Sequence, residues 1–145
     1  MPTRTARTAW DGGLVDGGGQ VELTTSGVGT FDVSWPRRSE DDAAGVTSPE
    51  ELVAAAHSSC FAMQLSHEIA EAGGTPQTLE VTASVDFGQV AGGGHGVTGI
   101  KLQLRGEVEG LDADGFAKAA EAAKVGCPIS RALAAVPISL EILDD

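Results

Sequence analysis

The feature that most constrains this chain is a stretch at residues 47–74, which reads TSPEELVAAAHSSCFAMQLSHEIAEAGG. Ser48 is a suitable N-cap, Pro49 suits the first helical position, and Glu51 can complete a capping box with Ser48. Residues with high helix propensity dominate from 52 to 70, and the two glycines after them favour termination. The stretch therefore predicts one long helix.

Apolar side chains point in nearly every direction around this predicted helix, and Cys60 lies at its centre. A helix that is apolar on all sides is usually buried. The remaining elements of a 145-residue chain do not easily enclose such a helix, so we expect a homodimer with a large apolar interface. The apolar positions are Leu52, Val53, Ala54, Ala55, Ala56, Phe61, Ala62, Met63, Leu65 and Ile69.

The rest of the chain predicts six strands and shorter helices. Alternating apolar and polar residues indicate strands, and glycine-rich turns join the first three. Strands and helices in runs, without regular alternation, are typical of the α+β class with antiparallel sheets. We expect the order βββ-α-ββ-αα-β in a single domain over residues 1–145, with the sheets wrapped around a buried central helix. The expected strands are 3–10, 20–25, 27–34, 78–87, 97–108 and 136–143; the other helices are 112–126 and a short segment from Pro128; residues 35–42 form a polar loop.

The composition argues against two classes of partner. The formal net charge is −12, from nine Lys and Arg residues against twenty-one Asp and Glu residues. Nucleic acids and anionic membranes bind basic surfaces, so neither is expected as a partner. No apolar run is long enough to span a bilayer, and the first ten residues lack the apolar middle of a signal peptide. We therefore expect a cytoplasmic protein.

Two cysteines, Cys60 and Cys127, are the candidate reactive groups. A thiol reacts as its thiolate, and burial among apolar side chains would raise the pKa of Cys60. Cys60 therefore needs a nearby cation, and the Arg37–Arg38 pair is the obvious source. Glu50, at the start of the long helix, could orient a guanidinium through planar pairing. Cys127 would gain from the N-terminus of the short helix that follows it.

These residues also have other interpretations. The sequence leaves open which cysteine attacks, and both could be buried, inert side chains, the commoner fate of intracellular cysteines. His57 could donate a hydrogen bond to Cys60, or could be a core histidine bonded to backbone. His57, Cys60, His67 and Cys127 could in principle bind zinc, but their spacing suits no common structural site, so no metal is expected.

Two segments resemble a known family. SPEELVAAAHSSCFAMQLSHEIAEAG, followed far downstream by KVGCPISRAL, closely resembles the OsmC/Ohr family of thiol-dependent peroxidases. The shared pattern is a proline and two acids at the helix start, the first cysteine ten residues after the first acid, and a second cysteine followed by proline. The likeness extends through nearly the whole chain, including the SWPRR loop. His57 stands where the Ohr branch has tyrosine, which favours the OsmC branch.

The resemblance implies a role for each site residue. Cys60 would be the peroxidatic cysteine and would form a sulfenic acid, and Cys127 would resolve it as a Cys60–Cys127 disulfide. Arg38 would activate the thiolate, with Arg37 as a possible substitute, and Glu50 would hold that arginine. The family forms intertwined homodimers with both active sites at the interface, which agrees with the expected apolar interface.

The resemblance also implies the reaction and its partners. Organic hydroperoxides would be reduced to alcohols in oxidative stress defence, without a bound cofactor. An external dithiol reductant would restore the thiols; a lipoyl protein, a thioredoxin-like protein and a small thiol all fit. Apolar walls from Val53, Phe61, Met63 or the partner chain would favour alkyl peroxides over hydrogen peroxide. The alternative is a non-enzymatic or redox-sensing member of the same fold.

Overall fold

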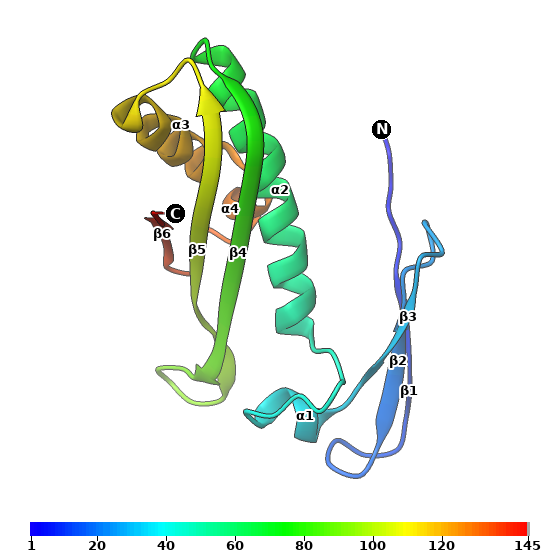
Figure 1. Ribbon diagram of the computed structural model, residues 1–145. Helices are drawn as coiled ribbons and strands as arrows, with labels where there is room; N and C mark the ends of the chain where they lie inside the picture. Colours follow the sequence, from blue (N-terminus) through cyan, green and yellow to red (C-terminus); the bar gives the residue numbers. More distant parts are fainter. Residues whose placement is uncertain (145) are drawn as a thin grey trace. The chain divides into compact units, whose positions relative to one another are not determined.

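The computed structural model describes residues 1–144 and divides into two compact units, Met1–Leu52 and Val53–Asp145 (Figure 1). The division falls just after the first turn of the long helix α2, Pro49–Glu71. The element order is βββ-αα-ββ-αα-β, which agrees with the expected α+β class and adds one short helix. Within residues 1–144, no helix is both long enough and apolar enough to cross a membrane.

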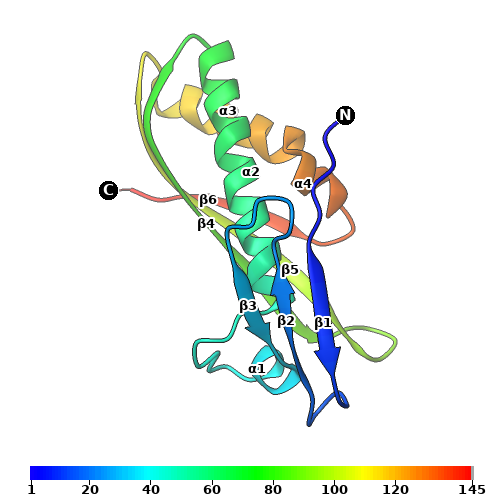
Figure 2. The same cartoon turned by 90° about the vertical axis from the view of Figure 1, so that its right-hand side faces the viewer.

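The first unit contains a three-stranded antiparallel meander. Strands β1 (Arg7–Asp11), β2 (Gly18–Glu22) and β3 (Thr30–Val33) lie side by side in that order (Figure 2). Val21 is the single buried apolar residue in the described segment 1–52. Large apolar side chains are exposed instead, at Trp10, Leu14, Val15, Val28 and Phe31. This sheet therefore has almost no core within its own unit.

A short helix, α1 (Trp35–Ser39), replaces the loop expected at residues 35–42. Ser34 caps it, because its Oγ accepts a hydrogen bond from the backbone N–H of Arg37 at 3.3 Å. Pro36 fits the first turn, where a missing N–H costs nothing. The prediction was wrong because a five-residue helix carries too little periodicity to be detected beside an adjoining strand.

Helix α2 begins nearly as the sequence predicts. The backbone N–H of Glu51 donates to Ser48 Oγ at 3.1 Å, which confirms Ser48 as the capping side chain. The Glu51 carboxylate accepts from Thr47 Oγ1 at 2.5 Å, so the acid stabilises the helix start through the preceding hydroxyl. The helix ends at Glu71, before the two glycines.

Within one chain, α2 is buried on a single face. His57, Phe61, Leu65 and Ile69 are fully buried, and their four-residue spacing places them on one stripe. Met63, on another face, is 73% exposed. The single chain therefore covers one stripe of the helix, and burial of the other faces stays a prediction that depends on the expected second copy. Alanines account for much of the apolar character of α2, and several of them lie on faces that no other element of the chain covers.

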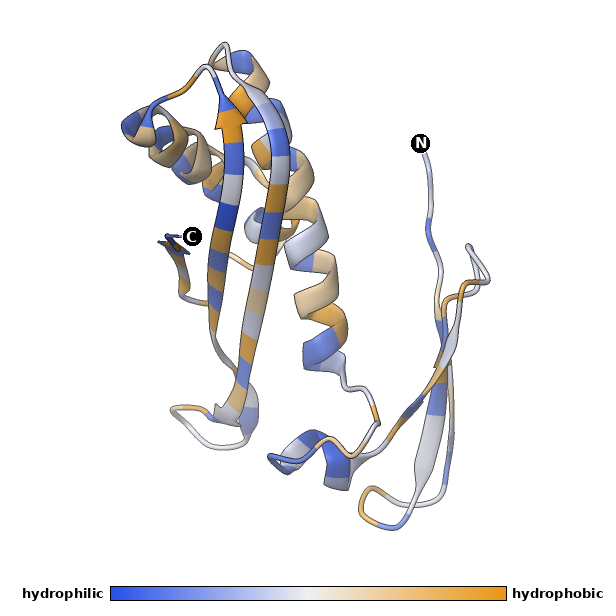
Figure 3. Cartoon of the chain, in the orientation of Figure 1, coloured by the Kyte–Doolittle hydropathy of each residue, from blue (hydrophilic) through white to orange (hydrophobic). Residues whose placement is uncertain are grey.

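The second unit is built on a long hairpin. Strands β4 (Thr75–Gln89) and β5 (His95–Glu109) pair antiparallel, two or three residues longer at most ends than expected. Orange and blue bands alternate along both strands in Figure 3, as expected for a sheet with one buried face. Ile100, Leu102 and Leu104 of β5 join the α2 stripe in the core.

The last strand departs from the antiparallel expectation. Strand β6 (Ile138–Ile142) pairs with β5 in parallel, with Leu102 opposite Leu140. It follows the helices α3 (Ala113–Gly126) and α4 (Pro128–Ala132), so the chain crosses over before returning to the sheet. Such a crossover returns a strand in the same direction, which is why the pairing is parallel.

Candidate active site

The two cysteine sulfurs meet in the core of the second unit. Cys60 Sγ lies 2.9 Å from Cys127 Sγ, and the two thiols share a hydrogen bond without a covalent link. Cys60 projects from the middle of α2 and is half-buried, whereas Cys127 is fully buried. Residues that are 67 positions apart in the chain therefore form one dithiol pair.

Cys127 occupies the junction between two helices. Its backbone N–H donates to the Ala123 carbonyl at 2.8 Å and ends α3, and its own carbonyl accepts from Arg131 N–H at 3.0 Å and begins α4. Pro128 takes the first position of α4. The sequence predicted this arrangement from Gly126, Cys127 and Pro128, and the structure confirms it.

The surroundings of the two thiols act on them in opposite directions. Burial raises the pKa of Cys60, and the hydrogen bond to Cys127 raises it further. Burial alone would also raise the pKa of Cys127, but the hydrogen bond with Cys60, the polar groups of Ser130 and the backbone N–H of Ile129 lower it overall. No capping hydrogen bond of regular geometry reaches the Cys127 sulfur, so these backbone N–H groups act on it mainly as dipoles. Within this chain the negative charge is thus better stabilised on Cys127.

His57 contacts a side chain that the sequence analysis missed. Its Nε2 lies 2.7 Å from Ser130 Oγ, so it bonds neither to Cys60 nor to backbone as the two sequence interpretations supposed. Both residues are buried, and burial lowers the pKa of His57. The available signal was the position of Ser130, three residues after Cys127 in the first turn of a short helix, where a hydroxyl can face the N-cap.

Arg38 and Glu50 form a close ion pair in the first unit. Arg38 Nη2 lies 2.8 Å from Glu50 Oε1, and Arg38 Nε donates to Oε1 and Oε2 at 2.9 and 3.1 Å. Glu50 is 7% exposed. The pairing implied by the resemblance is therefore present between Arg38 and Glu50.

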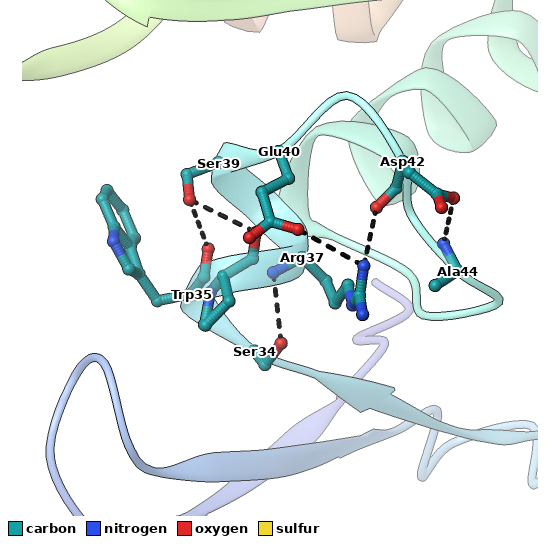
Figure 4. A network of polar contacts seen from close by, with 8 residues as sticks. Ser34, Trp35, Arg37, Ser39, Glu40, Asp42 and Ala44 are labelled. Atoms are coloured by element: carbon teal, nitrogen blue, oxygen red, sulfur yellow. Dashed lines mark hydrogen bonds and ion pairs between the residues drawn. The ribbon is translucent and has the colours of Figure 1, made fainter.

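Arg37 belongs to a different network, shown in Figure 4. Its Nη1 lies 3.3 Å from Glu40 Oε2 and donates to the Asp42 carbonyl at 3.3 Å. These contacts hold it within the α1 segment, as the acid-rich sequence after it predicted. The two adjacent arginines thus have separate partners.

The predicted apolar walls are only partly available. Phe61 is fully buried in the core, whereas Val53 is half-buried and Met63 is exposed. Phe61 therefore cannot line an open pocket in this chain. An apolar cavity of about 410 Å³ lies in the first unit beside Arg38. Its lining includes Trp10, Leu14, Val21, Trp35 and Leu52.

The four residues considered for zinc do not come together as one metal site, although the two cysteines meet. His67 is exposed on α2, and His57 is committed to Ser130 through Nε2. Over residues 1–144 there is no group of three or more His, Cys, Asp or Glu side chains placed to hold a metal ion.

Comparison with known proteins decides the family. The OsmC-like protein family model matches residues 41–141, which is more than half of the chain. The chain belongs to the OsmC-like family. Among curated OsmC relatives, "Peroxiredoxin OsmC" of Escherichia coli (strain K12) is 36% identical over 126 residues, covering 87% of this chain and 86% of the relative.

Two solved structures show the same family fold. The organic hydroperoxide resistance protein OhrB of Bacillus subtilis is 29% identical with a TM-score of 0.75, covering 96% of this chain and 98% of that one. An organic hydroperoxide resistance protein from Elizabethkingia anophelis is 28% identical with a TM-score of 0.78, covering 100% and 98%. The α+β fold expected from the sequence is thus confirmed as OsmC-like.

Proposed function

We propose that this OsmC-like chain is a thiol-dependent peroxidase that reduces organic hydroperoxides to alcohols. The names of its relatives support a peroxide-related redox function. The observation that carries the finer proposal is the 2.9 Å separation of the Cys60 and Cys127 sulfurs, because a sulfenic acid formed on one is within reach of the other.

Cys60 is the proposed peroxidatic residue because it is the more accessible thiol. Its sulfur attacks the distal oxygen of ROOH; the O–O bond breaks, and the sulfur becomes a sulfenic acid. The alkoxide that leaves takes a proton and is released as ROH. Cys127 is fully buried, so it is poorly placed to meet a peroxide first.

Cys127 is the proposed resolving residue. Its sulfur attacks the Cys60 sulfenic acid; the S–S bond forms, the S–O bond breaks, and the departing hydroxide leaves as water. An external dithiol, such as a lipoyl protein, a thioredoxin-like protein or a small thiol, then reduces the disulfide by exchange and is itself oxidised. No bound cofactor is needed in this cycle.

Arg38 is the proposed activating cation, and Glu50 is its positioning partner. The pKa of Cys60 is raised by burial, so its thiolate needs a positive charge when peroxide binds. Two nitrogens of the Arg38 guanidinium contact the Glu50 carboxylate, which fixes the orientation of the guanidinium. Arg38 also borders an apolar cavity suited to an alkyl chain. Arg37 instead bonds to Glu40 and to the Asp42 carbonyl in its own segment.

The active form is proposed to be a homodimer. The first unit exposes Trp10, Leu14 and Val28, and α2 exposes Met63. A three-stranded sheet with one buried apolar side chain needs a further apolar partner to be stable. A second copy of this chain would supply that partner, with Arg38 and Cys60 contributing to active sites at the interface.

Mass spectrometry after one equivalent of an alkyl hydroperoxide tests the proposal. We expect a Cys60–Cys127 disulfide in the wild-type protein and a dimedone-reactive sulfenic acid on Cys60 in Cys127→Ser. The matched control is Cys60→Ser, which should consume no peroxide. Unchanged thiols in the wild-type protein after this treatment would overturn the proposal and favour a non-enzymatic member of the fold.

A rate comparison tests the substrate class. Alkyl hydroperoxides should react faster than hydrogen peroxide, since only they gain from an apolar cavity. Comparable second-order rates for hydrogen peroxide and a bulky alkyl hydroperoxide would reject this preference and leave the disulfide chemistry standing.

A further inference from the structure

Two hydrogen bonds join helix α2 to helix α4 and its N-cap, one helical turn apart on each side. His57 Nε2 lies 2.7 Å from Ser130 Oγ, and the Cys127 thiol donates to Cys60 Sγ at 2.9 Å. His57 precedes Cys60 by three residues, and Ser130 follows Cys127 by three. Residues at this spacing lie on the same face of a helix, so the His57–Ser130 hydrogen bond is the neighbour of the sulfur pair.

The other side of Cys127 is closely packed against α2. A Cβ atom placed on Gly126 would lie 3.3 Å from Gln64 Nε2, so the end of α3 approaches this side chain closely. Gln64 is itself held, because its amide donates to Glu68 Oε1 at 2.8 Å. Cys127 therefore lies between a close backbone contact on its N-terminal side and the hydrogen-bonded Ser130 on its C-terminal side.

The burial of His57 is not explained by packing alone. Its side chain is fully buried, and within residues 1–144 its Nδ1 has no hydrogen-bond partner. A buried polar atom without a partner destabilises the folded state, whereas an apolar side chain of similar size would fill the same space without that cost. The contact with Ser130, which is itself 5% exposed, is the polar interaction that orients the ring.

We propose that His57 and Ser130 are positioning residues whose hydrogen bond holds the start of α4 against α2 and so keeps the Cys127 sulfur within bonding reach of Cys60. The two sulfurs need to close only from 2.9 Å to about 2 Å to form a disulfide. Without the hydrogen bond, the reduced chain would gain arrangements in which the sulfurs lie apart, and closure would become less favourable. The inference deepens the proposed peroxidase function and rests on it for its role in turnover.

In the proposed cycle this positioning affects the fate of the Cys60 sulfenic acid. Attack by the Cys127 sulfur forms the S–S bond and breaks the S–O bond, and the departing hydroxide leaves as water with the Cys127 proton. A second hydroperoxide competes by transferring its distal oxygen to the Cys60 sulfur, which becomes a sulfinic acid as ROH is released. A Cys127 sulfur held close to Cys60 favours the disulfide, so loss of the hydrogen bond should increase overoxidation.

The equilibrium between dithiol and disulfide tests the inference without peroxide. One molecule of glutathione disulfide oxidises the Cys60–Cys127 pair and yields two molecules of reduced glutathione, and alkylation followed by intact mass gives the oxidised fraction. A loss of stability that is common to the oxidised and the reduced protein cancels from this equilibrium constant. The constant therefore reports the positioning of the sulfurs, and a hydrogen bond with a purely structural role would leave it unchanged.

Single variants should change this constant selectively. Ser130→Ala should lower it about tenfold, a rise of about 30 mV in the potential of the pair. His57→Leu should lower it by a similar factor, whereas His57→Gln, whose side-chain amide can also bond to Ser130, should retain most of the wild-type value. Ser59→Ala is the matched control and should leave the constant unchanged, since the Ser59 hydroxyl bonds to the Ala55 and Ala56 carbonyls within α2.

The sign of the change separates positioning from stabilisation of a thiolate. A hydroxyl that stabilised a thiolate would stabilise the reduced form, so its removal would raise the equilibrium constant for oxidation. A hydroxyl that holds the sulfurs together has the opposite effect. An unchanged or increased constant in folded Ser130→Ala protein therefore overturns the inference.

A double variant keeps the test falsifiable if a single variant does not fold. His57→Leu/Ser130→Ala removes both partners and leaves neither buried and unpaired, a change that is expected to be nearly neutral for folding. Its constant should still be about tenfold below the wild-type value. A wild-type constant in this variant overturns the inference, and equal constants in His57→Gln and His57→Leu overturn the role of the hydrogen bond. Because no peroxide is used, these outcomes are independent of whether the chain turns over hydroperoxides.

Discussion

Arg38 donates to the buried carboxylate of Glu50 through two nitrogens, Nε at 2.9 Å and Nη2 at 2.8 Å from the same oxygen. The guanidinium is about one third exposed, and the carboxylate is almost fully covered. The pair ties α1 to the first turn of α2. Its geometry distinguishes Arg38 from its neighbour Arg37, whose partners lie within its own loop.

Replacing Arg38 should therefore affect both stability and rate. Arg38→Ala leaves the Glu50 carboxylate without its partner, and we expect a loss of about 1–3 kcal/mol in urea unfolding. The rate of Cys60 oxidation by an alkyl hydroperoxide should fall at least about tenfold, measured by stopped flow. Arg37→Ala is the control and should cost less than about 0.5 kcal/mol, because its ion pair is exposed. A larger rate loss in Arg37→Ala would reassign the activating role.

Replacing each of the two cysteines should disrupt peroxide consumption in a different way. Cys60→Ser should abolish peroxide consumption, whereas Cys127→Ser should consume one equivalent and then stop because the sulfenic acid cannot be resolved. Excess peroxide should then convert Cys60 in Cys127→Ser to the sulfinic acid, visible by intact mass. Multiple turnovers by Cys127→Ser with a dithiol that is too large to reach Cys60 would contradict the resolving role.

Acid should destabilise the protein through His57. Its folded pKa lies below the ordinary 6.5, so the unfolded chain binds a proton that the folded chain does not. The contribution of neutral His57 to the free energy of unfolding is complete above about pH 6.5 and is lost as the pH falls toward the folded pKa. Urea unfolding from pH 7 to about pH 5 should show this loss in the wild-type protein and a weaker one in His57→Gln. His67→Gln, at an exposed position of the same helix, should behave as wild type.

The exposed face of α2 provides a test of assembly. Met63 and Val125 are each 73% exposed in the single chain. If α2 forms the dimer interface, Met63→Glu should weaken the dimer by at least about tenfold in sedimentation equilibrium, because it buries a charge without a partner. Val125→Glu is the matched control, because it introduces the same charge at an equally exposed position on α3 instead of α2. A monomer in the wild-type protein at micromolar concentration would contradict the proposed assembly.

Sequence patterns predicted the elements that have strong local signals. The cap at Ser48, the alternation along residues 78–108 and the Gly126–Cys127–Pro128 junction each depend on neighbours in the chain, and each is present. The Arg38–Glu50 pair was predicted from a family motif and from the need of a guanidinium for a planar partner.

Other features depend on contacts that local patterns do not contain. The parallel pairing of β6 follows from a crossover through two helices, and the pairing of His57 with Ser130 joins residues 73 positions apart. Helix α2 was expected to be covered on every side because alanine counts as apolar. Apolar side chains are also common on protein surfaces, so the sequence pattern did not show which stripe of the helix is covered.

The 67-residue separation of Cys60 and Cys127 has an effect on the whole second unit. Oxidation would tie most of that unit into a covalent ring and reduce the entropy of its unfolded chain, a stabilisation of about 4 kcal/mol in the chain-entropy model. The oxidised form should then resist thermolysin longer than the reduced form. Protease susceptibility would thus report the oxidation state, and each catalytic cycle would alternate between a more and a less robust protein.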